Sequence, residues 1–124
     1  MGILSRLLKG TPKKQPVSIN DQNFHAEVMQ CDVPVMLDLW SATCPPCKQL
    51  EPVIMQLAAE FDGKVKVAEC DVANAQKVCA RYNVMSTPTI LYFRDGEVVE
   101  RVSGFRGSLY HREIIESELL PVEV

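Results

Sequence analysis

The stretch Cys44-Pro45-Pro46-Cys47 follows an apolar run that ends at Trp40, and it precedes a helical pattern of apolar residues. Both prolines fix the backbone angle φ and lack an N–H group. Because the first N–H groups of a helix have no partner inside the helix, proline costs no hydrogen bond there and is favoured at the first helical position. The stretch therefore predicts a helix with Cys44 at its cap position and Cys47 inside its first turn.

The composition predicts one folded domain that binds no nucleic acid. The chain has 124 residues, of which 47% are hydrophobic, and this is enough for a real core. Its net charge of −3 gives no sign of a nucleic-acid partner. No apolar stretch approaches the ~20 residues that a membrane span needs. A single small domain also predicts a monomer.

The N-terminal segment, residues 1–16, is predicted to be an extension and linker before a domain at 17–121. The segment begins basic and apolar, but Arg6 interrupts its apolar part. That part is too short for the ~7–15-residue core of a signal peptide. We therefore expect a cytoplasmic protein.

Hydrophobic periodicity predicts alternating strands and helices followed by a hairpin at Asp95-Gly96. The predicted strands are 17–19, 33–40, 65–72, 89–93 and 97–102. The predicted helices are 20–30, 44–62, 73–82 and 108–120. This βαβαβαββα order indicates an α/β fold with parallel strands, right-handed crossovers and a final antiparallel pair.

The close cysteine pair is suited to thiol–disulfide exchange. A thiol reacts as its thiolate, and the N-terminus of a helix stabilises negative charge, which lowers the pKa of Cys44. Cys47 lies one turn further along, close enough to form a disulfide with Cys44. We expect Cys44 to attack a substrate disulfide and Cys47 to attack the mixed disulfide, which releases reduced substrate and oxidised protein.

A structural metal site is the main alternative use of the pair. The chain has five cysteines, an odd number that does not fit a secreted disulfide framework. A zinc site needs two more ligands, usually a second close pair, whereas the remaining cysteines and the two histidines are scattered. We predict no bound metal. Cys70 and Cys79 are interpreted as small core residues, and Cys31 as an exposed one.

Asp38 is a second candidate for the chemistry because it interrupts the apolar run before the cysteines. An ionised carboxylate is costly to bury, so the pKa of Asp38 should rise. A carboxyl group that titrates near neutral pH can move a proton to or from Cys47. The alternatives are a buried acid satisfied by local hydrogen bonds, or one that faces outward.

These residues together resemble the thioredoxin family, over roughly residues 17–120. The stretches that carry the resemblance are Val35–Lys48, Pro52, Ser86-Thr87-Pro88-Thr89, Asp95-Gly96 and Gly104. The resemblance implies a thioredoxin fold, with a mixed five-stranded sheet flanked by four helices. It also implies a protein-disulfide oxidoreductase with no bound cofactor, which receives electrons from an NADPH-dependent or ferredoxin-linked thioredoxin reductase.

The resemblance further assigns roles to single residues. Cys44 would be the exposed attacking thiol, Cys47 the buried resolving thiol, and Asp38 the buried acid of the family. Pro88 would be a cis-proline, and the backbone of Thr87 beside it would bind an extended substrate. Trp40 and Gly104 would help to line that substrate groove.

Three positions depart from the family pattern and are predicted, together with Pro46, to tune the site. Thr43 stands where the family has tryptophan, which removes apolar surface from the docking face. Pro45 replaces a glycine and stiffens the first turn of the helix. Glu69 replaces a lysine beside Asp38, and two nearby carboxylates raise one another's pKa if both face the site.

The favoured hypothesis is a cytoplasmic thiol–disulfide oxidoreductase that mostly reduces protein disulfides. A second hypothesis is an interaction module of the same fold, tethered through its N-terminal segment, with catalysis secondary. A third is an exported oxidant or isomerase.

Overall fold

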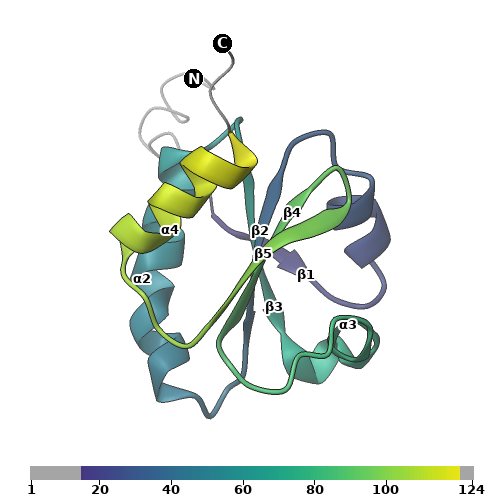
Figure 1. Cartoon of the computed structure of the whole chain (residues 1–124). Coiled ribbons are helices and arrows are strands. Elements are labelled where there is room, and N and C mark those ends of the chain that lie inside the picture. Colours follow the sequence, from purple (N-terminus) through teal and green to yellow (C-terminus); the bar gives the residue numbers. More distant parts are fainter. Residues whose placement is uncertain (1–14, 121–124) are drawn as a thin grey trace, which may run out of the picture.

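The computed structural model describes residues 15–120, which form a five-stranded mixed sheet with helices on both faces (Figure 1). The strands are β1 (Val17–Ile19), β2 (Val35–Trp40), β3 (Lys66–Asp71), β4 (Thr89–Arg94) and β5 (Glu97–Ser103). The helical segments are η1 (His25–Met29), α2 (Pro45–Glu60), η2 (Val72–Asn74), α3 (Gln76–Arg81), α4 (Ser108–Ile114) and η3 (Ile115–Leu119). The predicted α/β architecture and the order of its elements are confirmed.

Strand β2 lies at the centre of the sheet, whose strand order is β1-β3-β2-β4-β5. It pairs with β3 in parallel and with β4 in antiparallel. The parallel half, β1, β3 and β2, is built by crossovers through helices, while β4 and β5 form the predicted hairpin. Asp95 and Gly96 both have positive φ, 54° and 79°, as a tight hairpin turn of this type requires.

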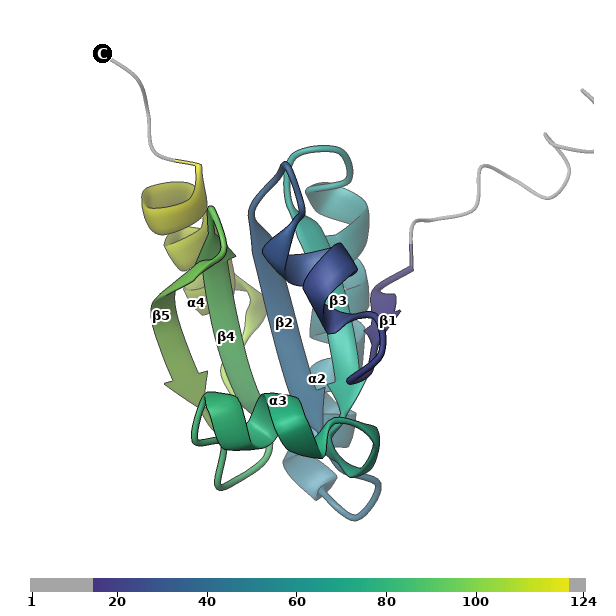
Figure 2. The same cartoon turned by 90° about the vertical axis from the view of Figure 1, so that its right-hand side faces the viewer.

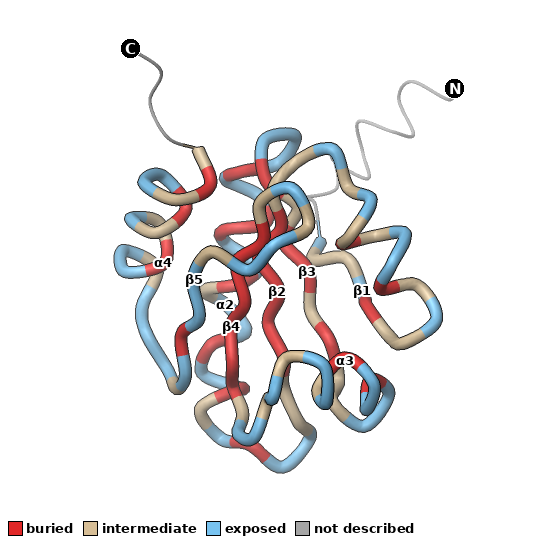
Figure 3. The backbone as a smooth tube through the Cα atoms, turned by 45° about the vertical axis from the view of Figure 1, so that its right-hand side comes forward, coloured by how far each residue is buried: buried red, intermediate tan, exposed pale blue. Residues whose placement is uncertain are grey.

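The helices form two layers, with α2 and α4 on one face of the sheet and η1 and α3 on the other (Figure 2). Successive side chains of a strand point to opposite faces. Met36 accordingly packs with the apolar residues of α2 and η3, whereas Leu37 and Leu39 pack with those of η1 and α3. Buried residues concentrate along the central strands (Figure 3). Asp38 has the same parity as Met36 and therefore lies on the α2 face.

The predicted helix at 20–30 is the largest error in the element boundaries. A turn occupies residues 21–23, and the helical segment η1 is restricted to His25–Met29. Asn20 nevertheless begins the helical turn. Its Oδ1 accepts the backbone N–H groups of Gln22 and Asn23, at 2.9 and 3.0 Å, as a helix-capping residue does, and its carbonyl accepts the Phe24 N–H at 3.0 Å.

Asp21 caps a helix that is distant in the sequence. Its carboxylate accepts the N–H groups of Lys77 and Val78 in the first turn of α3, at 3.0 and 3.1 Å. Its own N–H donates to the Asn74 carbonyl at 3.2 Å. The helix predicted at 73–82 is thus divided into η2 and α3, with Asp21 supplying the acceptor at the start of α3.

The predicted extension at residues 1–16 lies outside the described residues, apart from Gln15 and Pro16. Its expected role as a linker therefore stays a prediction. Within residues 15–120, no helix has the length and apolar character needed to cross a membrane.

A buried polar pair joins α4 to the sheet. His111 and Tyr92 are both completely buried, and the Tyr92 hydroxyl hydrogen-bonds with His111 Nδ1. The other ring nitrogen, Nε2, is buried with no hydrogen-bond partner among the described residues. Burial lowers the pKa of His111 from 6.5 to about 4, and the charge of Arg106 acts in the same direction. The folded protein therefore holds this imidazole neutral.

Replacing His111 with glutamine should make the protein less sensitive to acid. Above pH 6.5 the neutral imidazole causes no loss of stability. As the pH falls from 6.5 to about 4, the unfolded chain binds a proton that the folded chain does not bind, so stability is lost. The loss amounts to roughly 3 kcal/mol at about 1.4 kcal/mol per pKa unit. Urea unfolding of both proteins between pH 4 and pH 7.5 measures the difference.

His25→Gln is the matched control because His25 is exposed. That variant should follow the pH dependence of the unsubstituted protein. If His111→Gln also followed it, the buried imidazole would not be the group that titrates.

Candidate active site

Cys44 and Cys47 form a disulfide at the N-terminus of α2, with their Cα atoms 5.2 Å apart. Cys44 is the cap residue, in extended conformation, and Pro45 and Pro46 occupy the first turn. The Cys47 N–H donates to Cys44 Sγ at 3.2 Å. The predicted cap position is confirmed, since the sulfur itself accepts one of the unpaired N–H groups of the helix.

Cys47 is buried, as expected, whereas the expectation that Cys44 is exposed is wrong for this disulfide form. The exposed fractions are 6% for Cys44 and 5% for Cys47. The disulfide and the bond from the Cys47 N–H hold the Cys44 side chain against the first turn of its own helix. Thr43 and Pro45, which flank Cys44, are the exposed residues.

Hydrogen bonds join three loops, and these loops carry Thr87 and Pro88, Ser41 and Gly104. The Thr87–Pro88 peptide bond is cis, as predicted. The Gly104 N–H donates to the Pro88 carbonyl at 2.9 Å, and the Thr87 and Ser41 hydroxyls are hydrogen-bonded at 3.0 Å. Gly104 has φ +85°, a left-handed conformation that favours glycine. The loop before β4 is therefore joined to the segment after β2 and to the end of β5.

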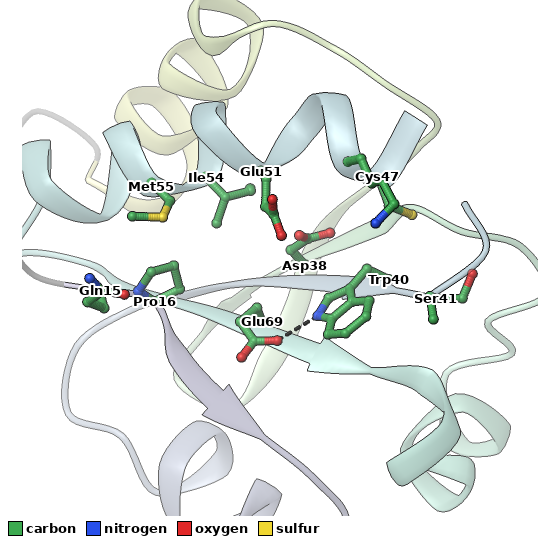
Figure 4. A pocket seen from close by; sticks show the side chains of 12 residues that line it. Gln15, Pro16, Asp38, Trp40, Ser41, Cys47, Glu51, Ile54, Met55 and Glu69 are labelled. Atoms are coloured by element: carbon green, nitrogen blue, oxygen red, sulfur yellow. Dashed lines mark hydrogen bonds between the residues drawn. The ribbon is translucent and has the colours of Figure 1, made fainter. Parts of the chain in front are cut away.

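Trp40 lies in a separate cavity of about 270 Å³ between α2 and the strands β2 and β3 (Figure 4). The cavity is lined by Gln15, Pro16, Asp38, Trp40, Ser41, Ala42, Cys47, Lys48, Glu51, Ile54, Met55 and Glu69. It reaches the disulfide from the side of Cys47. Thus the structure brings Trp40, Cys47, Asp38 and Glu69 together, while Thr87, Pro88 and Gly104 do not line this cavity.

Asp38 is buried in this cavity, with an exposed fraction of 4%. Burial raises its pKa from 3.8 to about 7, and the negative charges of Glu69 and Glu51 raise it further in that order. Its Oδ1 atom is buried without a hydrogen-bond partner among the described residues. Neither alternative that the sequence left open, a carboxyl group satisfied by local hydrogen bonds or one that faces outward, applies to this oxygen.

Glu69 faces the site, which is the condition that the sequence left open for its effect on Asp38. It lies opposite Asp38 in the register of β3 and β2, and both side chains line the cavity. Its Oε1 accepts the indole N–H of Trp40 at 2.5 Å. The Glu69 carboxylate is therefore anchored by the tryptophan on the neighbouring strand.

Two charged residues of the cavity, Glu51 and Lys48, were not identified from the sequence. Glu51 follows Cys47 by four positions on α2, which places it one turn further along the same side of the helix. This i, i+4 spacing from Cys47 was the signal in the sequence that could have identified Glu51 as a residue of the site.

The other cysteines lie away from the disulfide. Cys70 is fully buried, as predicted, and burial raises the pKa of its thiol to about 12. Cys79 is partly buried and packs against the same core, while Cys31 is half-buried rather than exposed. No group of three His, Cys, Asp or Glu side chains within residues 15–120 could hold a metal ion.

A disulfide that caps a helix can open to two thiols and close again, and it thereby exchanges two electrons with another disulfide. The fold and this site define the class of the protein: it is a thiol–disulfide oxidoreductase that acts by dithiol exchange through Cys44 and Cys47.

Comparison with known proteins identifies the family within that class. The sequence model of the thioredoxin family matches residues 15–116. Thioredoxin C-2 of Corynebacterium nephridii is 40% identical over 88 residues, which are 71% of this chain and 82% of that protein. A thioredoxin of Staphylococcus saprophyticus is 38% identical over 103 residues, 83% of this chain and 97% of its own. The chain belongs to the thioredoxin family.

The match extends to a plant relative. The M-type chloroplastic thioredoxin of Spinacia oleracea is 36% identical over 108 residues, which are 87% of this chain and 60% of that protein.

Replacing Asp38 with asparagine should stabilise the oxidised protein at alkaline pH. The folded state holds the Asp38 proton up to about pH 7, whereas the unfolded chain releases it near 3.8. Its contribution to stability is therefore complete below 3.8 and is lost as the pH rises through 7. The advantage of the variant should grow by up to about 4 kcal/mol between pH 4 and pH 8.5. Denaturant unfolding at a series of pH values measures it.

Asp62→Asn serves as the control, because Asp62 is exposed in the turn after α2. An advantage of Asp38→Asn that did not change with pH would contradict a buried, titrating carboxyl group.

Proposed function

We propose that the protein is a reductant of protein disulfides in which Cys44 attacks and Cys47 resolves. The observation that carries this assignment is the position of the Cys44 sulfur, which accepts the Cys47 N–H at the N-terminus of α2. Unpaired N–H groups and the helix dipole stabilise a negative charge there by up to about 2 kcal/mol. In the reduced protein they favour the thiolate of Cys44, the reactive form.

The reaction then proceeds in two exchanges. The Cys44 thiolate attacks one sulfur of the substrate disulfide, forms a mixed disulfide and releases the other sulfur as a thiolate. Cys47 loses its proton and attacks Cys44 Sγ, which breaks the mixed disulfide and forms the Cys44–Cys47 bond. The two electrons of the protein dithiol end on the two substrate sulfurs, each of which takes up a proton.

Asp38 is proposed as the base that receives the Cys47 proton. Asp38 and Cys47 line the same cavity, and the pKa of Asp38 near 7 allows it to accept and return a proton at neutral pH. The Oδ1 atom of Asp38 has no hydrogen-bond donor among the described residues, so it is free to accept a proton.

The surface around Cys44 is proposed to select the substrate. Thr87, Pro88 and Gly104 would receive an extended segment of the substrate, and Trp40 would support its edge. Thr43 and Pro45 are exposed beside Cys44, where they can change which partners dock, and Pro46 stiffens the same turn.

The proposed electron donor, substrates and cellular compartment follow from membership of the family. Thioredoxins in general take disulfide substrates and are reduced by a partner reductase. We propose that a thioredoxin reductase, NADPH-dependent or ferredoxin-linked, supplies the electrons, so that no bound cofactor is needed. A monomer in the cytoplasm is the setting in which a reducing dithiol of this kind would work.

Substituting the cysteines one at a time should separate their roles. Reduced Cys47→Ser protein mixed with insulin should accumulate a mixed disulfide through Cys44, because the resolving thiol is absent. Reduced Cys44→Ser protein should form none, because the helix N-terminus stabilises a thiolate at position 44, whose sulfur accepts the Cys47 N–H, and not at Cys47 inside the first turn. Mass spectrometry after acid quenching measures the adducts.

An adduct on Cys47 in the Cys44→Ser variant would show that the attacking and resolving roles are reversed. Absence of any adduct in both variants would contradict action on protein disulfides. The Cys31→Ser variant controls for adducts at the half-buried third thiol.

Replacing Asp38 with asparagine should slow the resolving step, since asparagine cannot accept the Cys47 proton. The expected decrease is roughly a hundredfold, the lower end for general acid–base catalysis. Rapid-quench trapping of the mixed disulfide between pH 6 and pH 9 measures the step. An unchanged rate across this range would refute the role of Asp38.

A further inference from the structure

Three carboxyl groups from three different elements line the cavity behind Cys47. Asp38 comes from β2, Glu69 from β3 and Glu51 from α2. Their burial differs in a graded way: Asp38 is 4% exposed, Glu69 is half-buried and Glu51 is exposed. In Figure 4 the Glu51 side chain extends from α2 toward Asp38. The cavity therefore connects a buried carboxyl group with one that reaches solvent.

Among the described residues, the cavity is the only route by which a proton on Asp38 can reach solvent. On β4 its register partner is Ile90, a fully buried apolar residue. The charged groups that line the cavity beside it are Glu69 from β3 and Lys48 and Glu51 from α2, while Gln15 and Pro16 close the end before β1. A proton that reaches Asp38 from Cys47 must leave through this cavity.

Of the two neighbouring carboxylates, Glu69 is the less free to carry a proton. Its Oε1 atom accepts the indole N–H of Trp40 at 2.5 Å, which fixes the side chain on the β3 side of the cavity. Glu51 has no hydrogen bond to hold it among the described residues, and it lies one helical turn from Cys47 on the same side of α2. It can move between Asp38 and the solvent.

We propose that Glu51 is the proton-exchange residue of this site: it takes from Asp38 the proton released by Cys47 and passes it to solvent. This inference rests on the proposed role of Asp38 as the base for Cys47. Glu51 does not touch the reacting sulfurs, so it is a positioning residue that acts through Asp38.

The proton balance of one turnover is closed by this route. When Cys47 attacks Cys44 Sγ, its S–H proton moves to the Asp38 carboxylate, and no electrons pass through either carboxyl group. Asp38 then transfers the proton to the Glu51 carboxylate, and Glu51 releases it to water. When a reductase later opens the disulfide, the same proton path runs in the opposite direction and delivers a proton to the Cys47 thiolate.

The test follows two signals during single-turnover oxidation of the reduced protein at pH 8, in weakly buffered solution, by excess dithionitrobenzoate, whose thiolate products take up no proton at this pH. Trp40 is the only tryptophan of the chain and lines the same cavity, so its fluorescence reports closure of the disulfide, while a pH-indicator dye reports the proton that reaches the solvent. The two signals should coincide in the unsubstituted protein. In Glu51→Gln, closure should keep its rate and proton release should be roughly tenfold slower than closure, an effect smaller than the roughly hundredfold effect of losing the base itself. Added imidazole, at constant ionic strength, should remove this lag by accepting the proton in place of Glu51.

Glu113→Gln is the matched control because it removes one negative charge from an exposed position on α4, outside the cavity. In this variant proton release should coincide with closure, as in the unsubstituted protein, and should not respond to imidazole. Proton release that coincides with closure in Glu51→Gln, or a lag that imidazole does not remove, would overturn the proposal.

Asp38→Asn distinguishes failure of this inference from failure of the function on which it rests. If Asp38→Asn is slow and Glu51→Gln is normal, Asp38 is the base and Glu51 carries no proton. If Asp38→Asn is itself normal, the base has been assigned wrongly, and the role of Glu51 is refuted with it.

Discussion

The pairing of β2 on both edges is the constraint on which the rest of the structure depends. β3 and β4 are hydrogen-bonded to the two edges of β2, and apolar residues cover both of its faces. A strand enclosed in this way cannot shift its register by one residue without exchanging its two sets of side chains. It therefore fixes the face on which Asp38 lies, the point at which the chain leaves at Trp40, and so the position where the cysteine helix begins.

The loop contacts and the cavity differ in their polar groups. In the loops, backbone groups of Pro88 and Gly104 and the hydroxyls of Ser41 and Thr87 are joined by neutral hydrogen bonds. In the cavity, charged groups gather around one buried carboxyl group. Ser41 belongs to both, since it lines the cavity and hydrogen-bonds with Thr87, so a substitution at Ser41 changes both surroundings.

Much of this arrangement could be predicted because the signals are local. Proline after Cys44, the Asp95-Gly96 turn and the apolar run along β2 each act over a few residues, and each predicted the correct element. The errors arise where a side chain acts at long range. Asp21 caps a helix more than fifty positions away, and Glu51 acquires its neighbours only when α2 packs on the sheet. The burial of Cys44 depends on the disulfide itself, a covalent state that the sequence does not specify.

The bond from Asp21 to α3 has a consequence for local unfolding. α3 has 6 residues, far fewer than an isolated helix needs to persist in water. Its order depends on its contacts, among them the carboxylate that follows the edge strand β1. Opening of the edge at Asp21 would therefore remove two acceptors from the start of α3 and favour the loss of that helix. The disulfide helix α2 lies on the opposite face of the sheet, and its cap uses none of these bonds.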